Sequence, residues 1–260
     1  MKFIYPFLFC LYFFLLLSFS LAKNHTPSGL EIMKKQDQIN RGFKDEKTET
    51  EMILKVRDQT SIRKFEFKIL ENAQIGDKTL FRFIEPADIR NTVLLTHENK
   101  TGDDNQWIYL PALKRTKRIA AKNKSASFVG SEFTYEDMTP HDINKYEHQY
   151  LKTELFEDHP CYVVESIPKY DYSGYSKVLS WIRTDIYQTI RQDFYDKKSK
   201  ELFKRSKMIN LNKFNEKYWR ANEIHMKNLK NNNETKLRNL HRFIGNDFQS
   251  SEFSKRAISR

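Results

Sequence analysis

The feature that most constrains the fold is a regular alternation of apolar and polar side chains over short runs. In residues 61–70, Phe65, Phe67 and Ile69 alternate with Lys64, Glu66 and Lys68. A period of two residues with one polar face is typical of an antiparallel strand that is solvated on one side. Similar runs recur along the chain between short turns, which indicates a strand-rich protein.

The stretch Leu80–Met138 contains three apolar runs, at 80–84, 92–96 and 106–110, separated by turn residues such as Glu85-Pro86. Each run is too short for a helix and is rich in β-branched or aromatic residues, so we predict three consecutive antiparallel strands. A fourth strand is predicted over Thr116–Ala121. A polar loop follows, and Ser131–Asp137 could begin a short helix.

The remainder of the chain continues the strand pattern. An amphipathic helix is predicted over Leu30–Phe43, with Ser28 as its N-cap and Gly42 as its stop. The segments after residue 145 add further strands, for a total of about ten to twelve joined mostly by short turns. Such a meander is expected to curl into a barrel or near-barrel. The end of the chain, Gly245–Arg260, is either a short helix or a frayed terminus, and fraying is favoured for its last few residues.

Residues 1–22 consist of one lysine, an apolar run and the small-x-small site Ser20-Leu21-Ala22. This pattern is typical of a secretory signal peptide, and it predicts an exported, periplasmic protein with one domain over residues 23–260. The alternative is an uncleaved membrane anchor, because the run approaches the length that spans a bilayer. Cys10 lies inside the run instead of after it, which argues against a lipidated cysteine.

The chain is basic, with 45 Lys and Arg against 34 Asp and Glu, a net charge of +11. Export argues against a nucleic acid as the partner of this charge. A basic exported protein would meet anionic lipid head groups or acidic faces of membrane proteins. The alternative is a solvated surface that reflects a proteome rich in Lys and Asn.

Residues suited to catalysis or metal binding are scattered. The seven histidines lack the close spacing of zinc sites, and the glycine and serine motifs of common enzymes are missing. The acid pairs Asp103-Asp104 and Glu136-Asp137 are of the kind that usually serves turns or helix starts. Cys161 begins an apolar run and is interpreted as a buried small side chain, the alternative being a nucleophile near His159. We therefore expect no enzyme, no metal and no cofactor.

Several linked segments, EPADIRNT, LLTHENK, DDNQWIYLPALKRTKRI and SFVGSEFTYEDM, resemble in order the outer-membrane lipoprotein-sorting proteins, a LolA-like branch of the lipoprotein carrier superfamily. The resemblance covers about sixty residues. It implies a mainly β fold, a single curved antiparallel sheet forming an incomplete, unclosed barrel with a few capping helices. It also implies handling of lipid or lipoprotein acyl chains in the periplasm, beside a membrane exporter of the resistance-nodulation (RND) type. We expect the protein to be a monomer.

Two sets of residues are candidate sites under this resemblance. An apolar cavity for acyl chains would be lined by Phe65, Phe67, Phe81, Phe83, Leu94, Trp107 and Tyr109, whose alternative role is ordinary core. A docking patch for head groups or a partner protein would be formed by Lys114, Arg115, Lys117 and Arg118, whose alternative role is to protect a sheet edge from aggregation.

The sequence thus leads to a non-enzymatic periplasmic carrier that binds lipid or lipoprotein acyl chains and transfers them towards the outer membrane. The alternative is a filled barrel that docks a membrane protein through its basic patch.

Overall fold

The computed structural model describes residues 26–140 and 142–259. The predicted signal peptide lies outside this part of the chain. Thirteen antiparallel strands form one sheet, in the spatial order β6-β5-β4-β3-β2-β1-β13-β12-β11-β10-β9-β8-β7. The strands are β1 (Asp45–Val56), β2 (Gln59–Leu70), β3 (Lys78–Glu85), β4 (Val93–His97), β5 (Asn105–Leu110), β6 (Arg115–Ile119), β7 (Tyr146–Phe156), β8 (His159–Pro168), β9 (Tyr175–Arg183), β10 (Thr189–Asp196), β11 (Leu202–Phe214), β12 (Tyr218–Asn228) and β13 (Glu234–Ile244).

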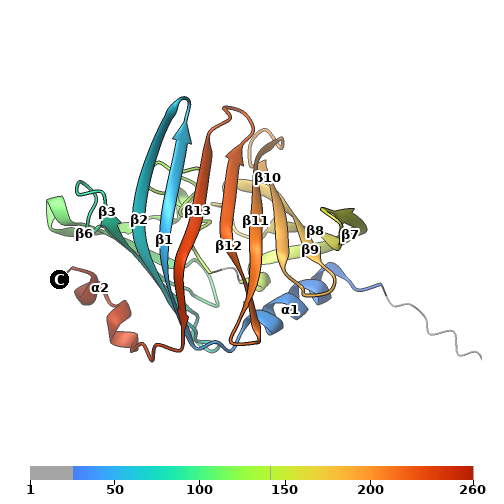
Figure 1. The fold of residues 1–260 in the computed structure, drawn as a ribbon, viewed down its shortest axis with the longest axis horizontal. Coiled ribbons are helices and arrows are strands. Elements are labelled where there is room, and N and C mark those ends of the chain that lie inside the picture. Colours follow the sequence, from blue (N-terminus) through green and yellow to red (C-terminus); the bar gives the residue numbers. More distant parts are fainter. Residues whose placement is uncertain (1–25, 141, 260) are drawn as a thin grey trace, which may run out of the picture.

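The sheet consists of two meanders, β1–β6 and β7–β13, joined where β1 pairs with β13. It is strongly curved (Figure 1), and β6 and β7 form its two edges without pairing to each other. The predicted incomplete antiparallel barrel is therefore confirmed. The predicted strand at Thr116–Ala121 corresponds to β6, Arg115–Ile119.

The connection between β6 and β7 has to pass from one edge of the sheet to the other, because these consecutive strands lie at opposite edges. Residues 120–145 make this connection with two short 3-10 helices, η2 (Ala121–Asn123) and η3 (Ile143–Lys145). We call residues 120–140 the crossing segment. Its Phe128, Phe133 and Met138 are buried in the main hydrophobic cluster. Residues 131–137 form turns and an isolated bridge between Ser127 and Thr134, so the short helix suggested there is absent.

The N-terminal helix α1 (Gly29–Asn40) covers one end of the curved sheet, close to β7 (Figure 1). Its start is fixed by a capping box, in which Ser28 and Glu31 satisfy each other's backbone N–H groups. Ile32 and Met33 pack on Val164 and Ile182. A Cβ atom at Gly29 would lie 2.6 Å from the backbone of Gln149, so the helix approaches β7 as closely as glycine permits.

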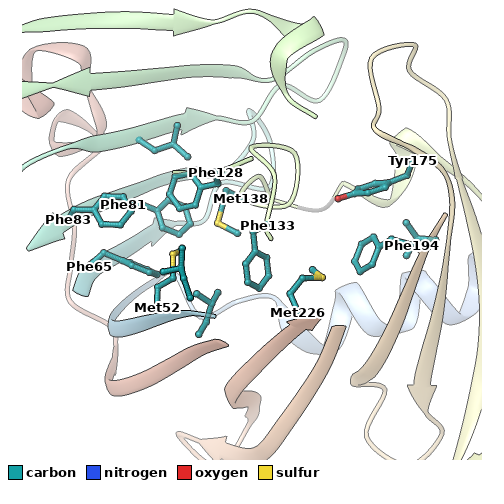
Figure 2. Packing of buried hydrophobic residues seen from close by; sticks show 14 residues of the cluster. Met52, Phe65, Phe81, Phe83, Phe128, Phe133, Met138, Tyr175, Phe194 and Met226 are labelled. Carbon is teal, nitrogen blue, oxygen red and sulfur yellow. The ribbon is translucent and has the colours of Figure 1, made fainter. Parts of the chain in front are cut away.

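The main hydrophobic cluster lies inside the curve. Figure 2 shows Phe133 between Met138 on one side and Met226 on the other, with the phenylalanines of β2 and β3 beyond. The crossing segment thus joins the two meanders through apolar contacts. The buried members of the main hydrophobic cluster are Met52, Leu54, Phe65, Phe81, Phe83, Leu94, Phe128, Phe133, Met138, Tyr175, Val178, Phe194, Met226 and Leu237.

The opposite face of β3–β5 is covered by the C-terminal tail. This tail forms a 3-10 helix, η4 (Ser250–Phe253), and a short helix, α2 (Lys255–Ile258). Phe253 and Ile258 are buried against Leu80, Val93 and Leu95. The tail is therefore docked as far as Ile258, because the side chains of Phe253 and Ile258 anchor it to the sheet, and the fraying expected for the last residues is not seen up to that point.

A candidate binding cavity inside the curved sheet

A large cavity lies between strands β1–β3, β12 and β13, the end of helix α1 and the end of the crossing segment. Its volume is about 450 Å³, and we call it the main cavity. Its apolar wall is formed by aromatic and aliphatic side chains of the sheet together with Met138 of the crossing segment. These sheet residues are Phe65, Phe67, Ile69, Phe81, Ala221, Ile224 and Leu237.

The phenylalanines reach the cavity because their strands place them on the concave face in register. Phe65 pairs with Phe83, and Phe67 pairs with Phe81, across β2 and β3. The rings of Phe67 and Phe81 lie 4.6 Å apart at their centroids, within the range of stable aromatic pairs. Phe67 and Ile69 stay partly exposed although they lie on the concave side, so part of the wall is not covered by protein.

The other end of the main cavity is charged. Glu46 is buried and accepts hydrogen bonds from Arg220 Nε at 3.0 Å and from Arg242. Arg41 lies 3.2 Å from buried Asp77. Burial lowers the pKa of Arg41, but the Asp77 and Asp37 carboxylates outweigh it and raise that pKa above its usual value. The charges at this end are thus paired with one another, which makes burial tolerable.

Some polar atoms around the main cavity lack partners within the described residues. Five buried side-chain polar atoms of this part of the chain make no hydrogen bond, and two of them, Thr79 Oγ1 and Arg242 Nε, belong to residues that line the main cavity. Buried polar groups normally find a partner, either protein or water. These two atoms lie in the polar part of the cavity wall, beneath its surface.

The crossing segment is tied to the sheet by two adjacent carboxylates. Glu136 accepts hydrogen bonds from the hydroxyls of Tyr170 and Ser173, each at 2.5 Å, and from the backbone N–H of Gly174 at 2.9 Å. Burial raises the pKa of Glu136, although the bonds from Ser173 and Tyr170 oppose this. Asp137 accepts from Tyr175 Oη at 2.8 Å.

Asp137 also binds Lys204 Nζ at 2.8 Å, and the Lys204 side chain is buried among the rings of Tyr175 and Phe194. Sequence analysis missed this role, because the pair Glu136-Asp137 has the form of an ordinary turn. Its partners come from residues 170–204 and give no local pattern.

Two further cavities flank the crossing segment. One, of about 230 Å³, lies under β8–β12 and is lined by Phe133, Tyr175 and Met226 among others. The other, of about 370 Å³, lies beside Asp104, Lys124 and Tyr146, and we call it the rim cavity. Thr139 lines all three cavities, so the end of the crossing segment separates them.

The seven predicted wall residues occupy three positions. Phe65, Phe67 and Phe81 line the main cavity. Phe83 and Leu94 belong to the packed cluster behind it. Trp107 and Tyr109 lie on the opposite face of the sheet, in the cluster covered by the C-terminal tail. The reason is strand parity: Leu94 pairs with Ile108, whereas Trp107 pairs with Leu95, so the two aromatic residues share the outer face.

The four predicted docking residues are all exposed. Arg115, Lys117 and Arg118 lie on the edge strand β6, and Lys114 precedes it in a left-handed turn. Arg118 donates a hydrogen bond to Asn105 Oδ1 at 2.6 Å. The basic run therefore forms a charged sheet edge, a position that suits both roles considered for it.

Cys161 is fully buried, and burial raises the pKa of its thiol to about 11, so it is not activated as a nucleophile. Among residues 26–140 and 142–259, His, Cys, Asp and Glu form no group of three or more that could hold a metal ion. In the same part of the chain, no helix has the length and apolar character needed to cross a membrane.

The chain was compared with protein-family models, with curated sequences and with solved structures. A family model described as "Uncharacterized protein" matches residues 76–260, and no curated protein sequence matches the chain. A domain from Vibrio parahaemolyticus, named as an outer-membrane lipoprotein-sorting protein, is 38% identical with a TM-score of 0.87, covering 89% of this chain and 98% of that one.

Two more distant structures share the fold. A DUF1329 family protein from Desulfovibrio piger is 24% identical with a TM-score of 0.84, covering 88% of this chain and 97% of that one. A LolA superfamily protein from Nitrosomonas europaea is 19% identical with a TM-score of 0.72, covering 89% and 99%. The chain belongs to the outer-membrane lipoprotein-sorting protein family, whose LolA-like fold it shares.

Proposed function

We propose that this protein is a non-enzymatic carrier that holds the acyl chain of a lipid or lipoprotein in its main cavity. The observation that supports this most directly is the cavity itself, about 450 Å³ with a wall of Phe65, Phe67 and Phe81 inside an unclosed sheet. Its size lies within the range of about 300–1,000 Å³ that is usual for ligand pockets.

The energetics of an acyl chain agree with this role. Each buried CH₂ group contributes about 0.8 kcal/mol, so ten of them would contribute about 8 kcal/mol before the costs of association. No covalent chemistry is needed for such binding. Release requires a change in the cavity wall, and Met138 to Pro140 of the crossing segment, like Asp37 and Asn40 of α1, are wall residues outside the sheet.

We further propose that the carrier works in the periplasm, as a monomer, and delivers its cargo towards the outer membrane. The family of the V. parahaemolyticus domain and the apolar run at residues 1–22 support this location. The source of the cargo would be a membrane exporter of the resistance-nodulation type, as the sequence resemblance implies.

The test is recovery of the protein from the cell envelope followed by native mass spectrometry, together with uptake of a fluorescent fatty acid by the delipidated protein. The carrier is expected to retain a lipid mass and to bind the probe in competition with unlabelled fatty acid. Purification without lipid combined with no probe uptake would contradict it.

The exposed basic edge favours a second candidate function, a module that docks a membrane protein. An acidic surface of that protein would then contact Lys114, Arg115, Lys117 and Arg118. In this case the cluster around Phe133 would serve only as a hydrophobic core. Reversal of charge at Arg115 and Arg118 should abolish cross-linking to an envelope partner in this case. Unchanged cross-linking would exclude the basic edge as the docking site.

A further inference from the structure

The rim cavity contains a largely buried lysine that lies near several carboxylates. Lys124 is only 7% exposed, yet its ammonium group makes no hydrogen bond or ion pair within the described residues. Its backbone is fixed, because Lys124 N–H donates to the carbonyl of Ala121 and its own carbonyl accepts from the N–H of Glu136. A charge held in this way is unfavourable unless something in the cavity pairs with it.

Four of the carboxylates that line the rim cavity are hydrogen-bonded or exposed to solvent. Asp104 binds Lys145 Nζ at 2.5 Å, and Glu136 accepts from Tyr170, Ser173 and Gly174. Asp103 and Asp171 are exposed, where water and salt screen them. Burial lowers the pKa of Lys124, although Asp104 and Asp103 oppose this. The rim cavity is thus lined by three lysines and five carboxylates, so it suits a ligand that carries both an anionic group and a hydrogen-bond donor.

The rim cavity is also lined by a buried carboxylate with one oxygen that has no partner within the described residues. Asp142 is 4% exposed, and its Oδ1 accepts from Asn144, whereas its Oδ2 has no partner within the described residues. Tyr146 and Tyr170 add aromatic surface, with ring centroids 5.8 Å apart. The exposed Lys169 adds a cation to the lining.

We propose that the rim cavity binds a phosphate ester that also carries an N–H or O–H donor, with the phosphate on Lys124 and the donor on Asp142 Oδ2. Phosphate fits better than carboxylate because it offers more acceptor oxygens to two ammonium groups, those of Lys124 and Lys169. The ester could be the head group of the carrier's lipid cargo or a free soluble molecule. The head-group source rests on the proposed carrier function, because the rim and main cavities meet at Thr139 and Pro140.

The test is calorimetric titration of the purified protein with glycerophosphoethanolamine, with inorganic phosphate, with acetate and with short-chain phosphatidylethanolamine. Lys124→Met is the test variant, and Lys122→Met is its control, since Lys122 is exposed in the same turn. We expect Lys124→Met to weaken glycerophosphoethanolamine binding at least tenfold, Asp142→Asn to weaken it less, and Lys122→Met to leave it unchanged. The thermal midpoint of Lys124→Met should not fall, because the variant removes an unpaired charge.

The outcomes distinguish a lipid head group from a soluble ester as the ligand, and they distinguish the rim-cavity proposal from the carrier proposal. Tighter binding of the phospholipid than of its head group supports a lipid source, and equal binding supports a soluble ester. Wild-type protein that binds none of the phosphate probes, or that binds acetate as tightly, overturns the inference, as does equal weakening by Lys122→Met. Uptake of a fluorescent fatty acid that persists in such a protein would leave the carrier proposal standing.

Discussion

Lys204 Nζ lies 2.8 Å from Asp137 Oδ2 in the interior of the sheet and also donates to the carbonyl of Glu132 at 3.3 Å. Lys204 is 1% exposed and belongs to β11, whereas Asp137 belongs to the crossing segment. This ion pair therefore fastens the segment that divides the cavities to the sheet that encloses them. Cargo entry under that segment would have to work against it.

Replacement of Lys204 by methionine should be strongly destabilising. It leaves Asp137 buried without its cation, and breaking a buried pair in this way costs about 3–5 kcal/mol. Lys207→Met on the same strand is the control, because Lys207 pairs with exposed Glu157. This variant should lower the free energy of unfolding by less than about 1 kcal/mol. The free energy of unfolding in urea measures both. Equal losses in the two variants would show that the Lys204 pair does not fasten the segment.

A pair of aromatic substitutions tests the proposed acyl-chain site on the concave face of the sheet. Phe67 lines the main cavity, and Tyr109 lies under the C-terminal tail on the other face. Phe67→Gln should weaken the binding of an alkyl probe about tenfold, which corresponds to about 1.4 kcal/mol, because a polar amide replaces part of the apolar wall. Tyr109→Gln should leave probe affinity unchanged even if it lowers stability. A loss of affinity only in Tyr109→Gln would place the acyl site elsewhere.

The docked tail predicts a change in protease sensitivity. Phe253 is 1% exposed and packs with Leu80 and Leu95, so Phe253→Ala should release residues 245–259 and expose them to cleavage. Phe243→Ala serves as the control, since Phe243 is 50% exposed. Limited proteolysis followed by mass spectrometry locates the cut. Identical cleavage rates in both variants would mean that Phe253 does not anchor the tail.

Asp193 should contribute to acid sensitivity. Burial would raise its pKa, but hydrogen bonds from Arg205 at 2.6 Å and from Arg191 at 2.6 Å hold that pKa below its usual value. A carboxylate with a lowered folded pKa stabilises the protein above its unfolded pKa of about 3.9, and this contribution is lost as the pH falls through the folded pKa.

Asp193→Asn should therefore lower the free energy of unfolding by about 1.5–3 kcal/mol at pH 7. Below a pH of about 4, the stability of this variant should fall less steeply with pH than that of the wild type. Asp158→Asn, at an exposed turn, should behave like the wild type. Urea unfolding at several pH values gives the slopes. A slope for Asp193→Asn that matches the wild type would exclude this carboxylate as an acid-sensitive group.

Much of the fold could be predicted from the sequence, because the signals are local. The alternation of Phe65, Phe67 and Ile69 predicted β2, and Ser28 predicted the start of α1, since a strand period and a capping residue act on their immediate neighbours. The resemblance of residues 85–138 to a known family gave the incomplete barrel.

The candidate site was predictable only in part. Phe65, Phe67 and Phe81 line the main cavity, whereas Trp107 and Tyr109 lie under the C-terminal tail on the other face. Both aromatic residues fit the alternation of a strand, and alternation does not say which face is concave. That depends on the register between β4 and β5, which is a contact between strands.

The sequence by itself determined where most strands lie, the antiparallel order of consecutive strands and the basic character of residues 114–118, because each depends on neighbours in the chain. The tertiary structure decided that β6 and β7 stand at opposite edges of the sheet. For this reason residues 120–140 cross the interior, Asp137 meets Lys204 and Lys124 is enclosed. These contacts join residues that are far apart in sequence, and they form because the pairing of β1 with β13 places the two meanders in one curved sheet.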